Sequence, residues 1–171
     1  MVDIQAQFDL NLRKSIKKKK QVAIIPIGSI EQHGPHLPIS TDSDIVTEVA
    51  KRLSEMKGYL LLPTLIYGVS FEHAPFFNLS IRESTLRTIL TDLCSSLLTN
   101  NIKTVFIING HHGNLKSIKN INVKTNNLNL HISIDNISNN LVKYGYSFGK
   151  LQMIPHFLTE KGLTLTHIMG P

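Results

Sequence analysis

Short, nearly continuous apolar runs alternate along this chain with stretches of helical periodicity. Three of the apolar runs, residues 22–28, 104–108 and 130–134, are bounded by polar residues or glycine, which is typical of strands covered on both faces. Between these runs, apolar residues recur at helical spacing from residue 43 onward and again over residues 83–98. This alternation restricts the chain to folds in which strands are joined by helices.

A fourth strand is predicted over residues 59–67, where Pro63 indicates an edge position, a bulge or a break into two pieces. A first helix is expected to end at the lysines of residues 17–20, and another helix to begin at about Leu115. Four strands separated by helices favour an α/β fold with three layers, a mostly parallel central sheet with helices on both faces. The length of 171 residues predicts one domain over residues 1–171.

The first buried strand runs into a loop, residues 28–42, that gathers carboxylates and imidazoles. In extended chain, the side chains of Glu31 and His33 lie on the same side about 6 to 7 Å apart, so both can reach one ion or two adjacent ions. Asp42 can turn back toward them because a glycine and two prolines break regular structure. Mixed carboxylate and imidazole ligands suit zinc, manganese or iron better than calcium or magnesium. The alternative is a polar loop whose histidines only satisfy backbone groups.

A second polar loop, residues 109–114, follows the strand at 104–108. It offers His111 and His112, glycines that let the backbone pass close to a ligand, and free amides at a helix start, which favour an anion or a developing oxyanion. In open parallel sheets, ligands bind beyond the carboxyl ends of the strands, and both loops leave such ends. We therefore expect the two loops to meet at one site, although a histidine pair after a strand also fits a structural role.

The net charge of +6 and the run Lys17, Lys18, Lys19 and Lys20 raise the question of nucleic-acid binding. The run falls at the end of the first predicted helix, where cations complement the helix dipole. Neither interleaved aromatic residues nor a nucleic-acid motif accompanies it. A nucleic-acid partner is therefore the weakest of the functional hypotheses.

Cysteine content and hydropathy indicate the cellular compartment of the protein. Cys94 is the only cysteine, so no intrachain disulfide can form, which fits a reducing cytoplasm. The start of the chain lacks an apolar run suited to secretion, and the longest apolar stretch, residues 59–69, is too short to span a bilayer. We expect a cytoplasmic protein with no membrane partner, and Cys94 in its core.

The polar loops also carry a family resemblance, which covers about residues 21–135. In order, four motifs resemble those of the creatininase (creatinine amidohydrolase) family: Glu31-Gln32-His33-Gly34-Pro35-His36-Leu37-Pro38, Thr41-Asp42, Glu72-His73 and Asn109-Gly110-His111-x-Gly113-Asn114, where x stands for any residue. The resemblance implies a creatininase-like α/β fold, an amidohydrolase activity with two divalent ions per active site (Zn, Fe or Mn), and assembly into a homo-oligomer, a hexamer in the family.

The resemblance also assigns roles to individual residues. By position, Glu31, His33, Asp42 and His111 match family metal ligands, with Asp42 as the bridge between the ions. Two adjacent ions would supply hydroxide near neutral pH and polarise the amide carbonyl. A protonated group must then reach the leaving nitrogen, and His112, His73 and His36 are the candidates. His36 is equally suited to orienting a metal ligand.

The chain departs from the family in places that bear on its substrate. Creatininase proper carries a glutamate ligand where this chain has Gly113, and the segment at residues 76–79 is altered. Gly113 resembles instead the wider family, which includes an archaeal formamidopyrimidine nucleotide deformylase and peptide-maturing relatives, in which a glutamate in a late His-Ala-Gly-Glu stretch completes the site. Residues 166–171 resemble that stretch only loosely. We expect a domain that lacks the usual C-terminal part of the family, and leave open whether Glu160 or a neighbouring subunit supplies the carboxylate.

Two main hypotheses follow. The preferred one is a metal-dependent amidohydrolase that cleaves a C–N bond of a small non-peptide or cyclic amide with a metal-activated water, with formamidopyrimidine nucleotide deformylation as the favoured reaction. The alternative is a shortened, catalytically impaired family member that acts as a metal-binding or assembly protein. Ion content and amide turnover distinguish the two.

Overall fold

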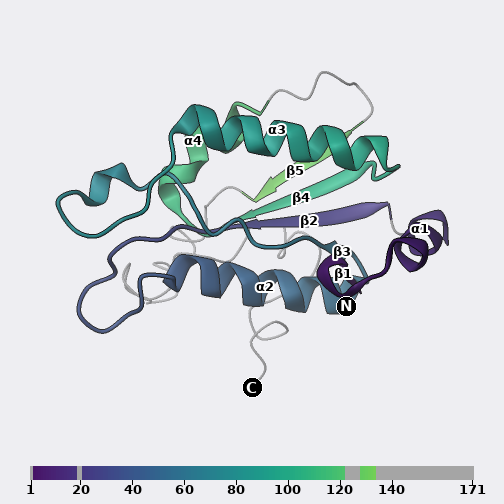
Figure 1. The fold of residues 1–171 in the computed structure, drawn as a ribbon, viewed down its shortest axis with the longest axis horizontal. Helices are drawn as coiled ribbons and strands as arrows, with labels where there is room; N and C mark the ends of the chain where they lie inside the picture. Colours follow the sequence, from purple (N-terminus) through teal and green to yellow (C-terminus); the bar gives the residue numbers. More distant parts are fainter. Residues whose placement is uncertain (1, 19–20, 122–127, 134–171) are drawn as a thin grey trace, which may run out of the picture.

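The structure is a computed structural model that describes residues 2–18, 21–121 and 128–133 (Figure 1). Its centre is a five-stranded sheet in the order β1-β3-β2-β4-β5, and every neighbouring pair is parallel. The strands are β1 (Val2–Asp3), β2 (Val22–Ile27), β3 (Leu60–Leu61), β4 (Thr104–Asn109) and β5 (Asn129–Ser133). The predicted parallel sheet is confirmed.

The strand predicted over residues 59–67 is broken into two pieces. Leu60–Leu61 forms β3, and beyond Pro63 a single bridge joins Leu65 to Ile27 of β2. β3 lies between β1 and β2, so the proline interrupts an inner strand and leaves the sheet edge to β1. β1 was not predicted, because two residues are too few to show a periodicity.

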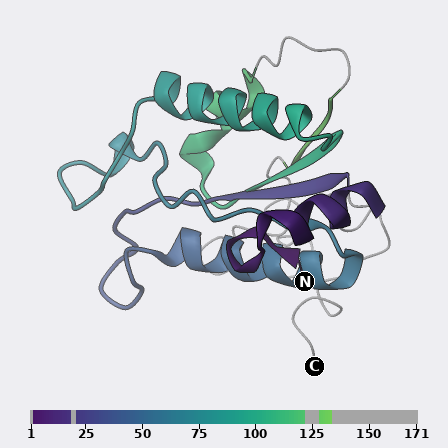
Figure 2. The same cartoon turned by 45° about the vertical axis from the view of Figure 1, so that its right-hand side comes forward.

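Helices cover both faces of the sheet, as predicted. Figures 1 and 2 show α2 (Thr41–Lys57) against one face, and α3 (Glu83–Thr99) and α4 (Leu115–Lys119) against the other. α1 (Asp9–Lys18) lies near β1 at the end of the sheet. Three short 3-10 turns, η1 (Ile4–Ala6), η2 (Phe71–His73) and η3 (His112–Asn114), complete the described elements. The three-layer α/β prediction is confirmed.

Alternate residues of β2 and β4 pack into two separate cores, because successive side chains of a strand point to opposite faces. Ile24 and Phe106 pack with α2, whereas Ile25 and Ile107 pack with the α3 face, where Cys94 also lies. Cys94 is fully buried, which confirms its predicted place in the core, and burial raises the pKa of its thiol to about 11. A sheet covered on both faces explains why its central strands are apolar throughout.

Other predictions lie outside the described residues, including those on Glu160 and residues 166–171. The single domain over residues 1–171 therefore stays a prediction. Within the described part of the chain, no helix combines the length and apolar character needed to cross a membrane.

Candidate metal centre

Two loops meet at the carboxyl ends of β2 and β4. A hydrogen bond from Gly110 N–H to the carbonyl of Ile27, 2.7 Å long, joins the second loop to the end of β2. The first loop leads from β2 into α2, so Asp42 stands in the first turn of that helix. The prediction that the two loops share one edge of the sheet is confirmed.

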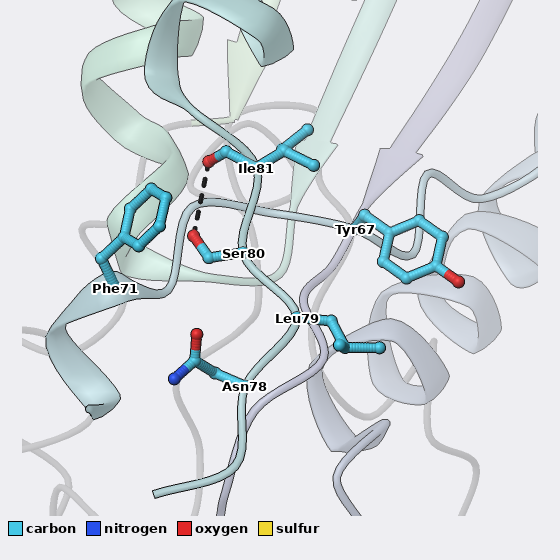
Figure 3. Close-up of a pocket in the computed structure, with 6 residues that line it drawn as sticks. All are labelled: Tyr67, Phe71, Asn78, Leu79, Ser80 and Ile81. Atoms are coloured by element: carbon cyan, nitrogen blue, oxygen red, sulfur yellow. Dashed lines mark hydrogen bonds between the residues drawn. The ribbon is translucent and has the colours of Figure 1, made fainter. Parts of the chain in front are cut away.

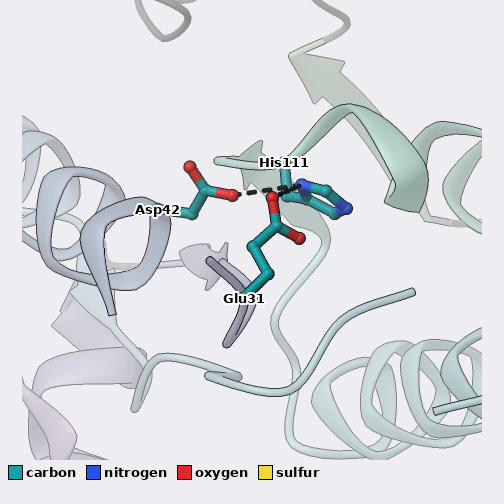
Figure 4. Close-up of side chains that lie close together, drawn as sticks. All are labelled: Glu31, Asp42 and His111. Carbon is teal, nitrogen blue, oxygen red and sulfur yellow. Dashed lines mark ion pairs between the residues drawn. The ribbon is translucent and has the colours of Figure 1, made fainter. Parts of the chain in front are cut away.

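Three predicted ligands form a compact, buried cluster at this edge (Figure 4). Nδ1 of His111 lies 3.2 Å from Glu31 Oε1 and 3.1 Å from Asp42 Oδ2. The three ligand atoms all lie within 4.8 Å of one another, and the exposed fractions of the residues are 3% for Glu31, 4% for Asp42 and 7% for His111. Two buried carboxylates around one imidazole nitrogen have the composition and spacing of a divalent metal site.

The fourth predicted ligand, His33, lies beside the same cluster. Its Nε2 is 3.1 Å from Asp42 Oδ1, while its Nδ1 is 3.1 Å from the carbonyl of Glu31. One oxygen of Asp42 therefore faces His33 and the other faces His111. This arrangement is the one that a carboxylate bridging two ions would need, and the bridging role stays a prediction.

The two nitrogens of His111 have different surroundings. Nε2 lies 2.8 Å from the carbonyl of Val69, to which it donates, and 3.3 Å from Glu72 Oε1. A backbone acceptor on one ring nitrogen fixes the ring and leaves the other nitrogen, here Nδ1, for a metal. Glu31 Oε2 is buried and has no hydrogen-bond partner among the described residues. An unsatisfied buried carboxylate oxygen at this point fits a cation that it would coordinate.

The candidates for proton donor are not equivalent. A pocket of about 300 Å³ is lined by Glu31, His33, Glu72, His73, His111 and His112 among others. His36 is exposed and does not belong to this lining, so its role stays a prediction. His73 is engaged on both ring nitrogens: Gln32 donates to Nδ1 over 3.0 Å, and Nε2 lies 3.0 Å from Glu31 Oε1. The imidazole of the exposed His112 makes no hydrogen bond to another described residue.

Ser29 and Asn114 support the site, and neither role was predicted. The Ser29 hydroxyl donates to Asp42 Oδ2 over 2.6 Å. The buried Asn114 donates to the carbonyl of Gly28 over 2.9 Å and accepts from the N–H of Val69 over 2.8 Å. Asn114 thus ties the end of β2 to the segment that carries the acceptor for His111. Ser29 precedes the first predicted motif and Asn114 ends the last one, but their contacts join positions far apart in the chain.

Removing the Ser29 hydroxyl is expected to weaken metal binding about tenfold, because a residue that orients a ligand contributes on that scale. The change is Ser29→Ala, measured by calorimetric titration with Mn²⁺. Ser40→Ala is the matched control, since that hydroxyl donates to the exposed Asp44. Equal losses in the two variants would contradict the role given to Ser29.

The protonation of His111 predicts a pH dependence of metal binding. Burial alone would lower the pKa of His111, but hydrogen bonds and charge from Asp42 and Glu31 outweigh burial and raise it to about 10. Burial alone would raise the pKa of Asp42, and the hydrogen bonds from His111 and Ser29 lower it instead. In the metal-free protein the proton on His111 therefore stands where a cation would bind, and an ion must displace it.

We expect the apparent affinity for Mn²⁺ to rise about tenfold per pH unit between about pH 6.5 and 8, as one proton is released per ion bound. Calorimetric titrations in buffers of different ionisation enthalpy measure that proton directly. An affinity that does not change with pH would show that no proton leaves His111.

Comparisons with known proteins identify the family of this chain. A family model described as creatinine amidohydrolase matches residues 11–153. The mycofactocin precursor peptide peptidase of Mycobacterium ulcerans (strain Agy99) is 40% identical over 106 residues, which are 56% of this chain and 42% of the relative. The 2-amino-5-formylamino-6-ribosylaminopyrimidin-4(3H)-one 5'-monophosphate deformylase of Methanosphaera stadtmanae (strain ATCC 43021 / DSM 3091 / JCM 11832 / MCB-3) is 30% identical over 122 residues, 70% of this chain and 52% of the relative.

The fold also matches a solved structure. The structure named "Creatininase Mn" superposes with a TM-score of 0.71 at 20% identity, covering 86% of this chain and 65% of that one. The chain spans about half the length of the curated relatives it matches. The family model covers most of the chain, so this chain belongs to the creatininase family.

Proposed function

We propose that this protein hydrolyses an amide C–N bond with a metal-activated water. The observation that carries the proposal is the buried cluster of Glu31, Asp42 and His111, in which one carboxylate oxygen has no partner among the described residues. A divalent ion at such a cluster lowers the pKa of a bound water and polarises the amide carbonyl. We propose zinc, manganese or iron, with two ions per site and His33 as a further ligand.

A side chain of the pocket must protonate the leaving group. The leaving nitrogen needs a proton when the C–N bond breaks, and the donor must reach it within hydrogen-bond distance. His73 is held between Gln32 and Glu31, which suits it to fixing Glu31. We assign the proton donor to His112, because it lines the pocket and its ring is not engaged by another described residue.

Two substrate classes are candidates. The sequence favours a small non-peptide or cyclic amide, and a deformylase relative supports a formamidopyrimidine nucleotide. A peptide amide is the second candidate, since the relative at 40% identity is a peptide peptidase. The described pocket lining contains neither lysine nor arginine, the residues that usually bind a nucleotide phosphate. This composition favours the peptide candidate.

Metal content and turnover together test the proposal. Purified protein reconstituted with Mn²⁺ or Zn²⁺ should hold close to two ions per chain and should hydrolyse an amide in a panel of formamides, cyclic amides and short peptides. One weakly held ion or none, together with no turnover across the panel, would instead support an impaired member that binds metal or serves in an assembly. Sedimentation of the same samples tests the proposed homo-oligomer.

A further inference from the structure

A second hollow lies next to the candidate metal centre. It has a volume of about 620 Å³ and is lined by Tyr67, Phe71, Asn78, Leu79, Ser80 and Ile81, which we call the aromatic groove (Figure 3). The large apolar side chains are well exposed: 55% for Phe71, 48% for Tyr67 and 45% for Leu79. None of the lining residues is charged. A neutral, apolar lining of this size suits uncharged side chains of a ligand.

One wall of the groove is an extended segment with an unused backbone edge. The N–H groups of Leu79 and Ile81 donate to the carbonyls of Ile30 and Gly68 over 2.9 Å each. Backbone groups alternate in direction along an extended chain, so those of Asn78 and Ser80 point the other way. Among the described residues, these N–H and C=O groups have no hydrogen-bond partner.

The side chains of this segment flank that edge. Figure 3 shows Asn78 and Ser80 on one side of the segment, toward Phe71, and Leu79 on the other side, toward Tyr67. The groove therefore combines a row of backbone donors and acceptors with apolar surfaces on both sides. These are the two components that proteins use to bind an extended peptide as an added strand.

The residues that line the groove are neighbours of residues that line the metal pocket. Asn78 forms an antiparallel bridge with Glu31, and residues directly opposite in such a pair carry their side chains on the same face. Phe71 immediately precedes Glu72 and His73, which line the metal pocket. The aromatic groove therefore adjoins the metal pocket at Glu72, so a peptide that extends past Phe71 would reach the lining of that pocket.

We propose that the aromatic groove binds a short extended segment of a peptide substrate, which pairs with the backbone of Asn78 and Ser80 and places uncharged apolar side chains against Phe71, Tyr67 and Leu79. This inference rests on the proposed amide hydrolysis, for which it names the substrate class. The free edge spans only two alternate residues, which fits a peptide of a few residues. A stable interface between two copies of a chain needs about 800 Å² per partner. An edge of two residues therefore suits a short peptide better than a second copy of this chain.

Binding of a fluorescein-labelled five-residue peptide that alternates valine with serine, measured by anisotropy on the full chain loaded with Mn²⁺, tests the inference. Phe71→Ala is expected to weaken binding at least about tenfold. Phe8→Ala, which removes an exposed ring outside the groove (80% exposed, against 55% for Phe71), is the control and should leave binding unchanged. N-methylation of the peptide should abolish binding at alternate residues and leave it intact at the residues between, since only every second residue pairs with the edge.

These experiments distinguish a failure of the groove inference from a failure of the proposed hydrolysis. Asp42→Asn should remove hydrolysis and retain peptide binding. If the unmodified protein binds the peptide but hydrolyses no amide, that result would count against the metal chemistry and not against the groove. Equal binding by the Phe71 and Phe8 variants, or a uniform effect of N-methylation, would overturn the inference. Absence of peptide binding, with Phe71→Ala reducing the size of an oligomer, would show that a second copy covers the groove and would also overturn it.

Discussion

Replacing Asp42 with asparagine is expected to abolish metal binding and to lower amide hydrolysis more than about 100-fold, beyond the loss typical of residues that only orient a ligand. Asp42 faces His33 with one oxygen and His111 with the other, so among the described residues it is the carboxylate placed between these two predicted ligands. Asparagine keeps the shape of the side chain and can still accept the hydrogen bond from Ser29. The fold should therefore persist.

Thermal unfolding with and without Mn²⁺ separates the loss of metal from a loss of fold. Ligands that bind only the folded state raise the melting temperature, so Mn²⁺ should raise it for the unmodified protein and not for Asp42→Asn. Asp44→Asn is the matched control, because Asp44 lies in the same helical turn but its exposed carboxylate accepts only from the Ser40 hydroxyl among the described residues. Hydrolysis unchanged by Asp42→Asn would refute the proposed function.

Adding a single methyl group at Gly113 is expected to disturb both the fold and the metal centre. A Cβ there would collide with the carbonyl of Val69 and would lie 2.6 Å from His111 Nε2 and 2.7 Å from Glu72 Oε1. Two of these atoms hold His111 in place, so relief of the collision must turn the ring or move the segment at Val69. We expect Gly113→Ala to cost about 3 kcal/mol of stability and to weaken metal binding as well.

Gly34→Ala is the control for Gly113→Ala. A Cβ at Gly34 would make only ordinary van der Waals contact, since the nearest atom lies 3.7 Å from the point that it would occupy, but the φ of +76° disfavours a side chain. The change should therefore cost about 1 kcal/mol, the ordinary penalty for a left-handed residue. Urea unfolding of the two variants compares their losses in free energy of unfolding. Equal losses would mean that the crowding at Gly113 is relieved at no cost in stability.

The crowding at Gly113 also bears on the family comparison. By the sequence resemblance, creatininase proper carries a ligand glutamate at this position. In this structure the carbonyl of Val69 occupies the space where such a side chain would begin, and a carboxylate oxygen of Glu72 lies 2.7 Å from the same point. A glutamate at Gly113 would therefore require a different path for the segment from Val69 to Glu72.

The central fold was predictable because its strands are buried on both faces. The apolar runs that form β2 and β4 leave no polar face, and the stripe containing Leu86 and Leu90 marks the side of α3 that packs on them. The short β1 gave no such signal. Pro63 predicted an irregularity, but the placement of β3 inside the sheet depends on its pairing with β1 and β2, which no local pattern encodes.

The candidate ligands were predictable for a related reason. Parallel strands bring their carboxyl ends to one edge, so polar residues that follow two neighbouring strands must lie close together. The supporting contacts were not predictable, because they join residues that no periodicity relates. Asn114 and Gly28 are 86 positions apart, and His111 and Val69 are 42 apart. The partner of His111 follows only from the path of the segment between Gly68 and Glu72.

An anomalous diffraction map at the zinc absorption edge, from crystals grown with Zn²⁺, tests the metal centre most directly. We predict a strong peak about 2.0–2.2 Å from a carboxylate oxygen of Glu31, a carboxylate oxygen of Asp42 and Nδ1 of His111, with a second peak beside His33. Zinc bound only elsewhere, with the direct contacts of His111 to Glu31 and Asp42 retained, would contradict the account.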